Sequence, residues 1–489
     1  PVNLSADQAP RPVQGENLLF LSDLHLGEAC KEHTRIEYLK RGALLDRHVC
    51  GFLEHHTRVR PDGRPWRLIL GGDLVDFLQV TMVPHGTTGD AARFGLGTRE
   101  EESAWKLGRL MERHRDVFVY LADFVGAGNR IELIQGNHDE ELFWPAVRDA
   151  LVHGLIELYF GGEGVGDQSP EAFAERVRFN TWFYYQPGLI YVEHGHRFDD
   201  FCATPPQLCP LRPNAEDQLT QPISSLAIRY FANLERGFRT HEKEHWGVRD
   251  YFRYYRARGW GHVAEVAGRY VGLVTRSAAY HLEHGRFDSE RAEAETERRL
   301  GELSDTHGIE QATLRRLDAL GARSVVAIPF GVFVVMAGAE WSAVLGLLLT
   351  VLLTLVTSWG WVVDLLLCGA ALGGGLGFVR YARRCFPADV RRKLDEAAEA
   401  IGELLDVPVV ILGHSHGAVR RRMRHDHRAF YLNTGCFLAA EQADHGADDP
   451  CSCVSTYVTL HQHGPYERPH PTLSRWCSVR AEPAPFGVT

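Results

Sequence analysis

Five short polar clusters carry the side chains of this sequence that could do chemistry. They are Asp-x-His at 23–25, Gly-Asp-x-x-Asp at 72–76, Gly-Asn-His-Asp at 136–139, His-Gly-His at 194–196 and Gly-His-Ser-His at 413–416. A mixture of imidazole, carboxylate and amide ligands suits manganese, iron or zinc better than calcium or magnesium. The clusters therefore predict a transition-metal site, provided that the fold brings them together.

Short apolar runs precede the clusters and recur after them. They cover 18–23, 67–73, 130–139, 189–195, 407–416, 429–435 and 456–461. Continuous runs of this kind are typical of strands buried on both faces. Helical periodicity at 31–56 and 101–125 separates the early runs, which predicts an α/β fold with helices on the faces of a sheet. Ligands of such sheets bind beyond the carboxyl ends of the strands, where the clusters lie.

In order and content, the clusters resemble the motifs of the calcineurin-like metallophosphoesterase superfamily. The resemblance is carried by motifs alone, scattered over about half of the chain. It implies a two-sheet sandwich flanked by helices, and a dinuclear centre that hydrolyses phosphate esters. Two cations roughly 3.5–4 Å apart can clamp phosphoryl oxygens and lower the pKa of a bridging water.

The resemblance also assigns a role to each matching residue. The seven implied metal ligands are Asp23, His25, Asp73 and His416 for the first ion, with Asp73 bridging, and Asn137, His194 and His414 for the second. His138 is the expected general acid, and Asp76 is expected to orient it, with Asp139 as the alternative. An extended backbone at 23–25 would point both side chains to the same side. Asn-Thr-Gly at 433–435 resembles the closing strand of the family.

Other polar residues have simpler explanations. His33, His48, His55 and His56 are interpreted as structural, because isolated histidines beside apolar runs seldom bind metal. For His196 a surface, substrate-contacting or positioning role stays open. Asp199 and Asp200 are interpreted as solvated or capping residues, and Arg420, Arg421 and Arg422 as a solvated basic turn rather than a phosphate site.

The composition is that of a globular protein large enough for two or three domains. The net charge is −10, so the chain as a whole lacks the excess of positive charge that is typical of nucleic-acid-binding proteins. The ten cysteines do not have the regular spacing of a disulfide framework, so we expect most of them to be reduced, as in the cytosol. Residues 1–17 are polar and rich in proline, which does not suggest a signal peptide.

One segment is unusually apolar. Between 324 and 379 the only charged residues are Glu340 and Asp364, and this length would allow two membrane-spanning helices. A buried hairpin in a soluble protein is the alternative. Both halves of the site must meet in one compartment, so an even number of crossings is required. Arginines on both flanks place that compartment in the cytoplasm.

These patterns predict four regions. They are a discontinuous metallophosphoesterase core at 15–204 and 400–465, a helical insert at 205–322, a transmembrane hairpin at 323–380 and a C-terminal tail at 466–489.

The predicted protein is a membrane-bound hydrolase of a phosphate ester or diphosphate, with manganese as the favoured metal and iron or zinc as alternatives. A lipid-linked substrate would suit a site beside a membrane hairpin. The early motif resembles that of bacterial UDP-diacylglucosamine hydrolases, but their asparagine motif usually differs from Gly-Asn-His-Asp. The alternatives are a phosphodiesterase for nucleotides or nucleic acid, a protein phosphatase and a non-catalytic membrane scaffold. Substrate-binding residues and oligomeric state are not predicted.

Overall fold

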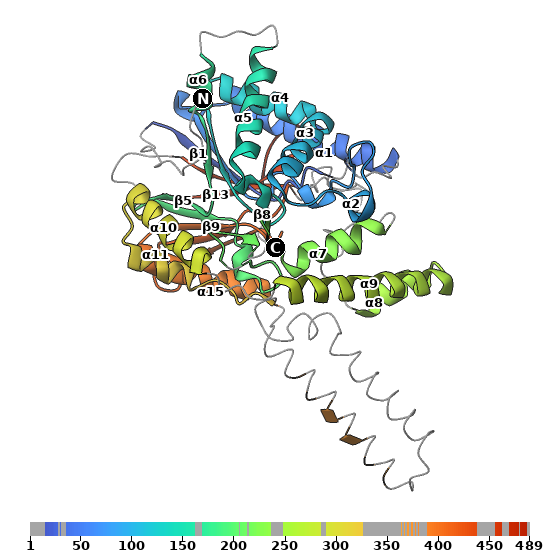
Figure 1. Ribbon diagram of the computed structural model, residues 1–489. Helices are drawn as coiled ribbons and strands as arrows, with labels where there is room; N and C mark the ends of the chain where they lie inside the picture. The colour runs from blue at the N-terminus through green and yellow to red at the C-terminus, as the bar shows by residue number, and fades with distance from the viewer. Residues whose placement is uncertain are drawn as a thin grey trace.

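Two β-sheets pack face to face at the centre of the molecule, and helices cover their outer faces (Figure 1). This computed structural model describes residues 15–27, 30, 36–161, 169–204, 206–212, 215–235, 248–284, 290–325, 389–437, 455–461, 469–478 and 480–486, and eight separate positions between 363 and 380. The predicted α/β class, with two sheets and flanking helices, is confirmed.

The first sheet has seven strands in the order β14-β13-β12-β1-β2-β3-β4. Their bounds are β1 Asn17–Leu21, β2 Trp66–Gly71, β3 Arg130–Ile134, β4 Val177–Asn180, β12 Thr456–Leu460, β13 Thr472–Cys477 and β14 Glu482–Pro485. The strands β1 to β4 run parallel, whereas β12 pairs antiparallel with β1. Residues predicted as a C-terminal tail thus supply β13 and β14 of this sheet.

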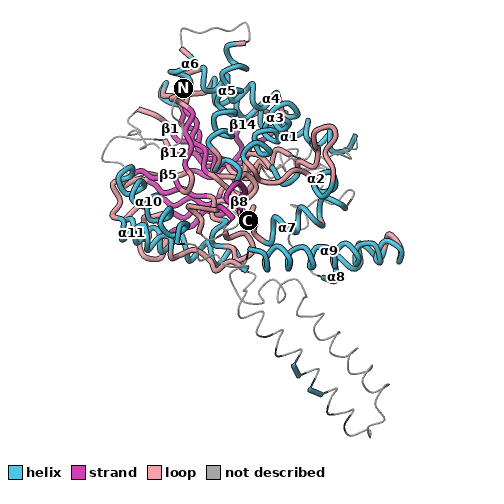
Figure 2. Tube along the Cα trace, in the orientation of Figure 1, coloured by secondary structure: helices cyan, strands magenta, loops and turns pink. Residues whose placement is uncertain are grey.

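The second sheet has five strands in the order β10-β11-β9-β6-β5. They are β5 Phe183–Gln186, β6 Ile190–Glu193, β9 Val409–Leu412, β10 Val419–Arg422 and β11 Phe430–Asn433. The central strands β6, β9 and β11 are parallel to one another. Figure 2 shows the two sets of strands stacked between layers of helix.

Strand β1 shows why these runs are apolar on both faces. Leu19 and Leu21 point to the helices on the outer face, while Leu18 and Phe20 point to the second sheet. Alternate side chains of a strand project to opposite faces, so a strand between two layers has no solvent-facing side. Burying each such side chain stabilises the fold by roughly 1.5–3 kcal/mol.

The helices of the N-terminal half cover the outer face of the first sheet. They are α1 Ile36–Arg58, α3 Glu100–Arg113, α4 Arg115–Gly126 and α5 Pro145–Phe160, with the shorter α2 Gly89–Phe94 and α6 Pro170–Ala174 nearby. The helical pattern at 101–125 is divided between α3 and α4 at His114. The ring of this buried residue lies 2.7 Å from a carboxylate oxygen of Asp46 on α1.

Three later helices cover the outer face of the second sheet, namely α10 Glu290–His307, α11 Gln311–Asp318 and α15 Val390–Leu405. The helices α7 Ile223–Tyr230, α8 Val248–Arg256 and α9 Trp260–His284 follow a small hairpin of β7 Leu211–Arg212 and β8 Ala215–Leu219. Short 3-10 turns occur at η2 Pro61–Gly63, η3 Phe77–Gln79, η4 Glu140–Phe143, η5 His196–Phe198 and η6 Ala232–Leu234.

Within the described residues, no helix has both the length and the apolar character needed to cross a membrane. The run at 324–379, for which a transmembrane hairpin is predicted, lies almost entirely outside those residues. The hairpin therefore stays a prediction. Among the described cysteines, Cys30, Cys50, Cys202 and Cys209 are free thiols, whereas Cys477 is disulfide-bonded.

Candidate metal centre

The five polar clusters converge at one rim of the two sheets. Each cluster follows the carboxyl end of a strand, in the order β1, β2, β3, β6 and β9. The first three strands are parallel neighbours in one sheet, and the last two are parallel neighbours in the other. Side chains from both sheets can therefore meet in a single site, as the interatomic distances show.

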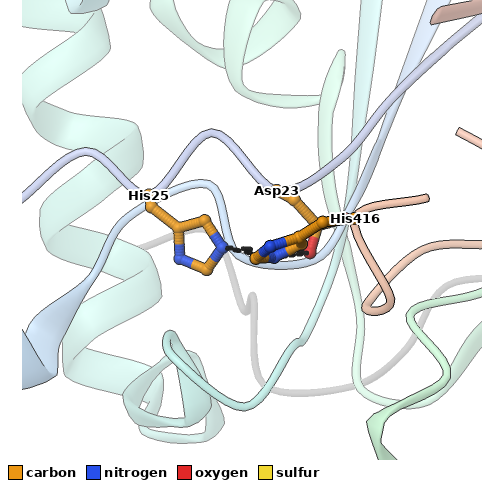
Figure 3. A group of neighbouring side chains, drawn as sticks. All are labelled: Asp23, His25 and His416. Atoms are coloured by element: carbon orange, nitrogen blue, oxygen red, sulfur yellow. Dashed lines mark hydrogen bonds and ion pairs between the residues drawn. The ribbon is translucent and has the colours of Figure 1, made fainter. Parts of the chain in front are cut away.

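Asp23, His25 and His416 form the first group of possible ligands (Figure 3). The Nε2 atoms of His25 and His416 are 3.1 Å apart. Nε2 of His416 also lies 3.3 Å from Oδ1 of Asp23. Ligand atoms of all three residues lie within 4.8 Å of one another, so they can face one cation.

Asp73 lies between this group and a second one. Its Oδ2 atom is 3.8 Å from Nε2 of His25 and 3.3 Å from Nε2 of His194. Oδ1 of Asn137 is 3.1 Å from the same Nε2 of His194. The other nitrogen of His194 lies 2.9 Å from the carbonyl oxygen of Gly71, which fixes the ring orientation. This geometry agrees with the bridging role expected for Asp73.

His414 belongs to a third group, with Asp199 and Cys202. Its Nε2 atom lies 3.1 Å from Oδ2 of Asp199, and its ring centroid is 5.3 Å from that of His194. The interpretation of Asp199 as solvated or capping is wrong in part, because this carboxylate is buried against an expected ligand. A carboxylate on the second ring nitrogen is typical of metal-binding histidines.

The backbone at the expected ligands is unusual. Five of them have positive φ angles, namely Asp23 at 55°, His25 at 49°, Asp73 at 54°, His414 at 67° and His416 at 53°. The extended backbone expected at 23–25 is therefore wrong. Such conformations cost of order 1–3 kcal/mol each in a residue other than glycine, and they concentrate at functional sites.

Two glycines allow the close approach of the ligand loops. A Cβ atom on Gly136 would lie 2.2 Å from Oδ1 of Asp73. Gly72 has a φ of +91°, and a Cβ atom there would lie 2.5 Å from Nδ1 of His194. The glycine that begins each of these two clusters is thus required for packing around the side chains of Asp73 and His194.

Asp76 contacts the expected general acid. Its Oδ2 atom lies 2.9 Å from Nδ1 of His138, and its Oδ1 atom caps η3 by accepting a hydrogen bond from the backbone amide of Gln79, the last residue of that turn. Asp139, the alternative partner, instead accepts hydrogen bonds from the amides of Leu74 and Gly136. Asp139 therefore holds the backbone of two ligand loops.

The electrostatics favour bound cations. Burial favours neutral carboxyl groups, but His194 and His416 outweigh it and lower the pKa of Asp23 to about 2. Burial likewise opposes charge on His138, yet Asp76 and Asp73 raise its pKa to about 9. Buried carboxylates that stay ionised require a compensating positive charge. The donor set and its negative charge therefore fit divalent metal ions.

The loop that carries His414 and His416 is held by Asn433, the last residue of β11. The side-chain amide of Asn433 donates to the carbonyl oxygen of Gly413 at 2.7 Å. The amide of Thr434 donates to Leu412, which joins the same two segments. Residues 433 and 434 thus position the loop that carries His414 and His416.

Some polar residues singled out in the sequence lie outside the ligand groups. His196 is buried, and burial followed by His194 and His414 keeps its pKa well below the usual value. Arg421 pairs with Asp395 and Glu399 of α15, so the basic segment 420–422 is a strand docked on an acidic helix rather than a turn. His33 lies outside the described residues.

Comparisons with protein-family models, curated proteins and solved structures find no match for this chain.

Proposed function

We propose that the chain is a calcineurin-like metallophosphoesterase that hydrolyses a phosphate ester or diphosphate at a dinuclear centre. The observation that carries the proposal is the meeting of the expected ligand groups at one rim. His25 and His416 are separated by 391 positions in the chain, yet their Nε2 atoms are 3.1 Å apart. Left-handed backbone at five expected ligands supports a functional origin of this geometry.

In this proposal the ligands divide into two sets that share one carboxylate. Asp23, His25 and His416 would hold one ion, and Asn137, His194 and His414 would hold the other, with Asp73 shared by both. The bound ions supply an activated water and neutralise the developing phosphoryl charge. Manganese is the favoured ion, with iron or zinc as alternatives, because the ligands combine imidazole, carboxylate and amide groups.

His138 is the proposed general acid. Asp76 holds Nδ1 of the imidazole, so Nε2 on the opposite side of the ring is the donor to the leaving oxygen. Asp76 and Asp73 raise the pKa of His138 to about 9 despite burial, which favours the protonated ring in the metal-free site. A protonated ring is the state that an acid needs before the bond to the leaving group breaks.

The substrate we propose is a lipid-linked phosphate or diphosphate at a membrane surface. The support is the sequence alone, since the apolar run at 324–379 stands between the segments that carry the two halves of the site. Turnover of monoester, diester and pyrophosphate substrates, measured with manganese in the presence and absence of detergent, tests this class.

Asp73→Asn tests the dinuclear centre itself. We expect loss of bound metal and a fall in turnover of an aryl phosphate on the order of 10³-fold, as when transition-state charge loses its stabilising group. Metal is measured by mass spectrometry of the purified chain. Asp62→Asn is the matched control, because Asp62 is exposed and shares the left-handed backbone outside the site. Near-normal turnover and metal in Asp73→Asn would refute the bridging role.

A further inference from the structure

A cavity of about 530 Å³ lies between the core and the helices that follow it. Arg93 and Phe94 of α2 form one wall, and Arg269 and Arg276 of α9 form another, with Asn233 of η6 beside them. We call this cavity the arginine pocket. Its volume is in the range of small-molecule sites, which run from about 300 to 1,000 Å³.

Hydrogen bonds fix the walls of the arginine pocket to the core. The side-chain amide of Asn233 donates to the carbonyl oxygen of Leu78 in η3 at 2.7 Å. The guanidinium of Arg229 on α7 donates to the carbonyl oxygens of Leu96 and Gly95, just after α2. Figure 1 shows α7 and α9 beside α2, as these contacts require. The pocket is therefore a built feature of the fold.

Glycines keep the pocket open on the side of α9. Gly268 and Gly272 both line it, one helical turn apart, and a Cβ atom at either position would meet no atom within 4 Å. Glycine in the middle of a helix costs about 0.5–1 kcal/mol relative to alanine. No packing contact requires glycine at these two positions. Their presence on the helix face that lines the cavity is explained if a ligand occupies the cavity.

Arginine is the main charged residue type in the lining of the pocket, and Glu265 of the same lining pairs with Arg269. Three arginines line it against one acidic residue, Glu265. Arg276 pairs with Asp90 at 2.6 Å, and Arg269 pairs with Glu235 at 2.9 Å. Arg93 forms no ion pair with any residue that the structure describes, and its guanidinium lies 5.0 Å from the centre of the Phe94 ring.

Phe94 also contacts a second guanidinium, that of Arg276, at 4.7 Å from the ring centre. The buried ring therefore contacts two guanidinium groups that line the pocket. Guanidinium groups bind phosphate through paired N–H donors, and stacking on an aromatic ring reduces the entropy lost on binding. An anion of phosphate type is the ligand that this chemistry recognises.

Turn η3 connects the pocket to the candidate metal centre. The amide of Phe77 in η3 donates to the carbonyl oxygen of His138, the proposed acid, at 3.0 Å. Thr81, which lines the pocket, lies only five residues after Asp76, and that length of chain spans at most ~18 Å. One substrate with two phosphate groups could therefore reach both places.

We infer that the arginine pocket binds a second phosphate group of the substrate, distal to the phosphorus that is hydrolysed. This inference rests on the proposed phosphoesterase function for its substrate, but the pocket's affinity for phosphate can be measured without turnover. The shared chemistry is a phosphate monoester carried on an organic group, whether a sugar, a glycerol or a nucleoside.

The test is calorimetric titration of the full chain carrying Asp73→Asn, with EDTA present, so that the metal centre contributes no metal-dependent phosphate binding. The probes are inorganic phosphate, glycerol 3-phosphate and uridine 5′-monophosphate. We expect one site that prefers an ester. Adding Arg93→Ala should weaken its Kd about tenfold, the loss expected for one charge-assisted hydrogen bond. Adding Gly272→Leu should abolish binding by filling the cavity.

Gly261→Leu is the matched control. It changes a glycine of the same helix that also has open space around it and does not line the pocket, so binding should be unchanged. Circular dichroism checks that each variant folds, and leucine favours the helix relative to glycine. Binding that survives Gly272→Leu would overturn the inference, and so would an equal affinity for inorganic phosphate and both esters.

The two proposals fail separately. A manganese-loaded wild-type chain without turnover on any phosphate ester refutes the phosphoesterase, whatever the calorimetry shows. A chain that hydrolyses an aryl phosphate but binds neither ester in the calorimetric experiment keeps the phosphoesterase and loses the pocket.

Discussion

The proposed role of His138 as general acid can be tested directly by mutation. We expect His138→Ala to keep its bound metal, since this residue lies outside the seven expected ligands. The rate should fall by about 10²–10⁴-fold, the usual contribution of a positioned acid. The loss should be greater for an alkyl phosphate than for a nitrophenyl phosphate, whose leaving group needs no proton. Equal losses for both esters would argue against an acid role.

Asp199 is expected to act through His414 rather than on the substrate. Asp199→Asn should weaken metal affinity about 10- to 100-fold, because the carboxylate orients the ring and raises its basicity. Affinity is measured by competition with a chelator. Asp200→Asn is the control, since Asp200 pairs with Lys393 of α15 and not with a ligand. Equal affinities in the two variants would show that the contact with Asp199 is only structural.

The types and order of the site residues could be predicted from the sequence, because the chemistry of metal binding limits which side chains serve. The partner of His414 could not, since Asp199 follows another cluster and nothing local marks its burial. The left-handed backbone of Asp23 and Asp73 could not be predicted from the sequence either. Both residues also take part in tertiary hydrogen bonds that no local pattern predicts, such as the bond from the His138 amide to Oδ1 of Asp73.

At the scale of elements, the packing of α1 on the first sheet depends on a neutral histidine. His56 is buried, and its ring contacts Trp66 of β2, Tyr457 of β12 and Trp476 of β13. Burial lowers the pKa of His56 to about 3. The unfolded chain takes up a proton as the pH falls through 6.5 and the folded chain does not. Stability is therefore present above pH 6.5 and lost as the pH falls toward 3.

His56→Phe should remove this dependence while keeping an aromatic ring in place. Between pH 7.5 and pH 5.0 the wild type should lose about 2 kcal/mol more unfolding free energy than the variant, at roughly 1.4 kcal/mol per pH unit below 6.5. Urea denaturation with EDTA present measures both values. Parallel losses in the two proteins would mean that His56 is protonated in the folded state.

Most central strands could be predicted because they are apolar on both faces, whereas the edge strand β14 and its neighbour β13 could not. In β13 the run TLSRWC contains polar and charged residues, and β14 is largely exposed. Edge strands need no continuous apolar pattern, since one side of the ladder and much of their surface contact water. The break at His114 was visible only as an interruption of the apolar stripe, and the contact of His114 with Asp46 on another helix could not be predicted.

At the scale of the whole molecule, the apolar run predicts membrane retention. We expect the full chain to stay in the membrane pellet after a carbonate wash at high pH. A variant lacking 323–380 should move to the supernatant and still bind metal, because the expected ligands all lie outside that segment. Release of the full chain by the wash would refute the predicted hairpin.

The sheets interleave the two halves of the chain. Strand β1 lies between β2, which follows it, and β12 from the far end of the sequence. In the other sheet, β9 and β11 from the C-terminal half extend from β6. A protease that cut between α11 and α15 would therefore leave two fragments that stay associated through strand pairing in both sheets. During translation, the proposed metal centre could form only after both His414 and His416 had been synthesised. A product truncated before these residues would therefore be inactive.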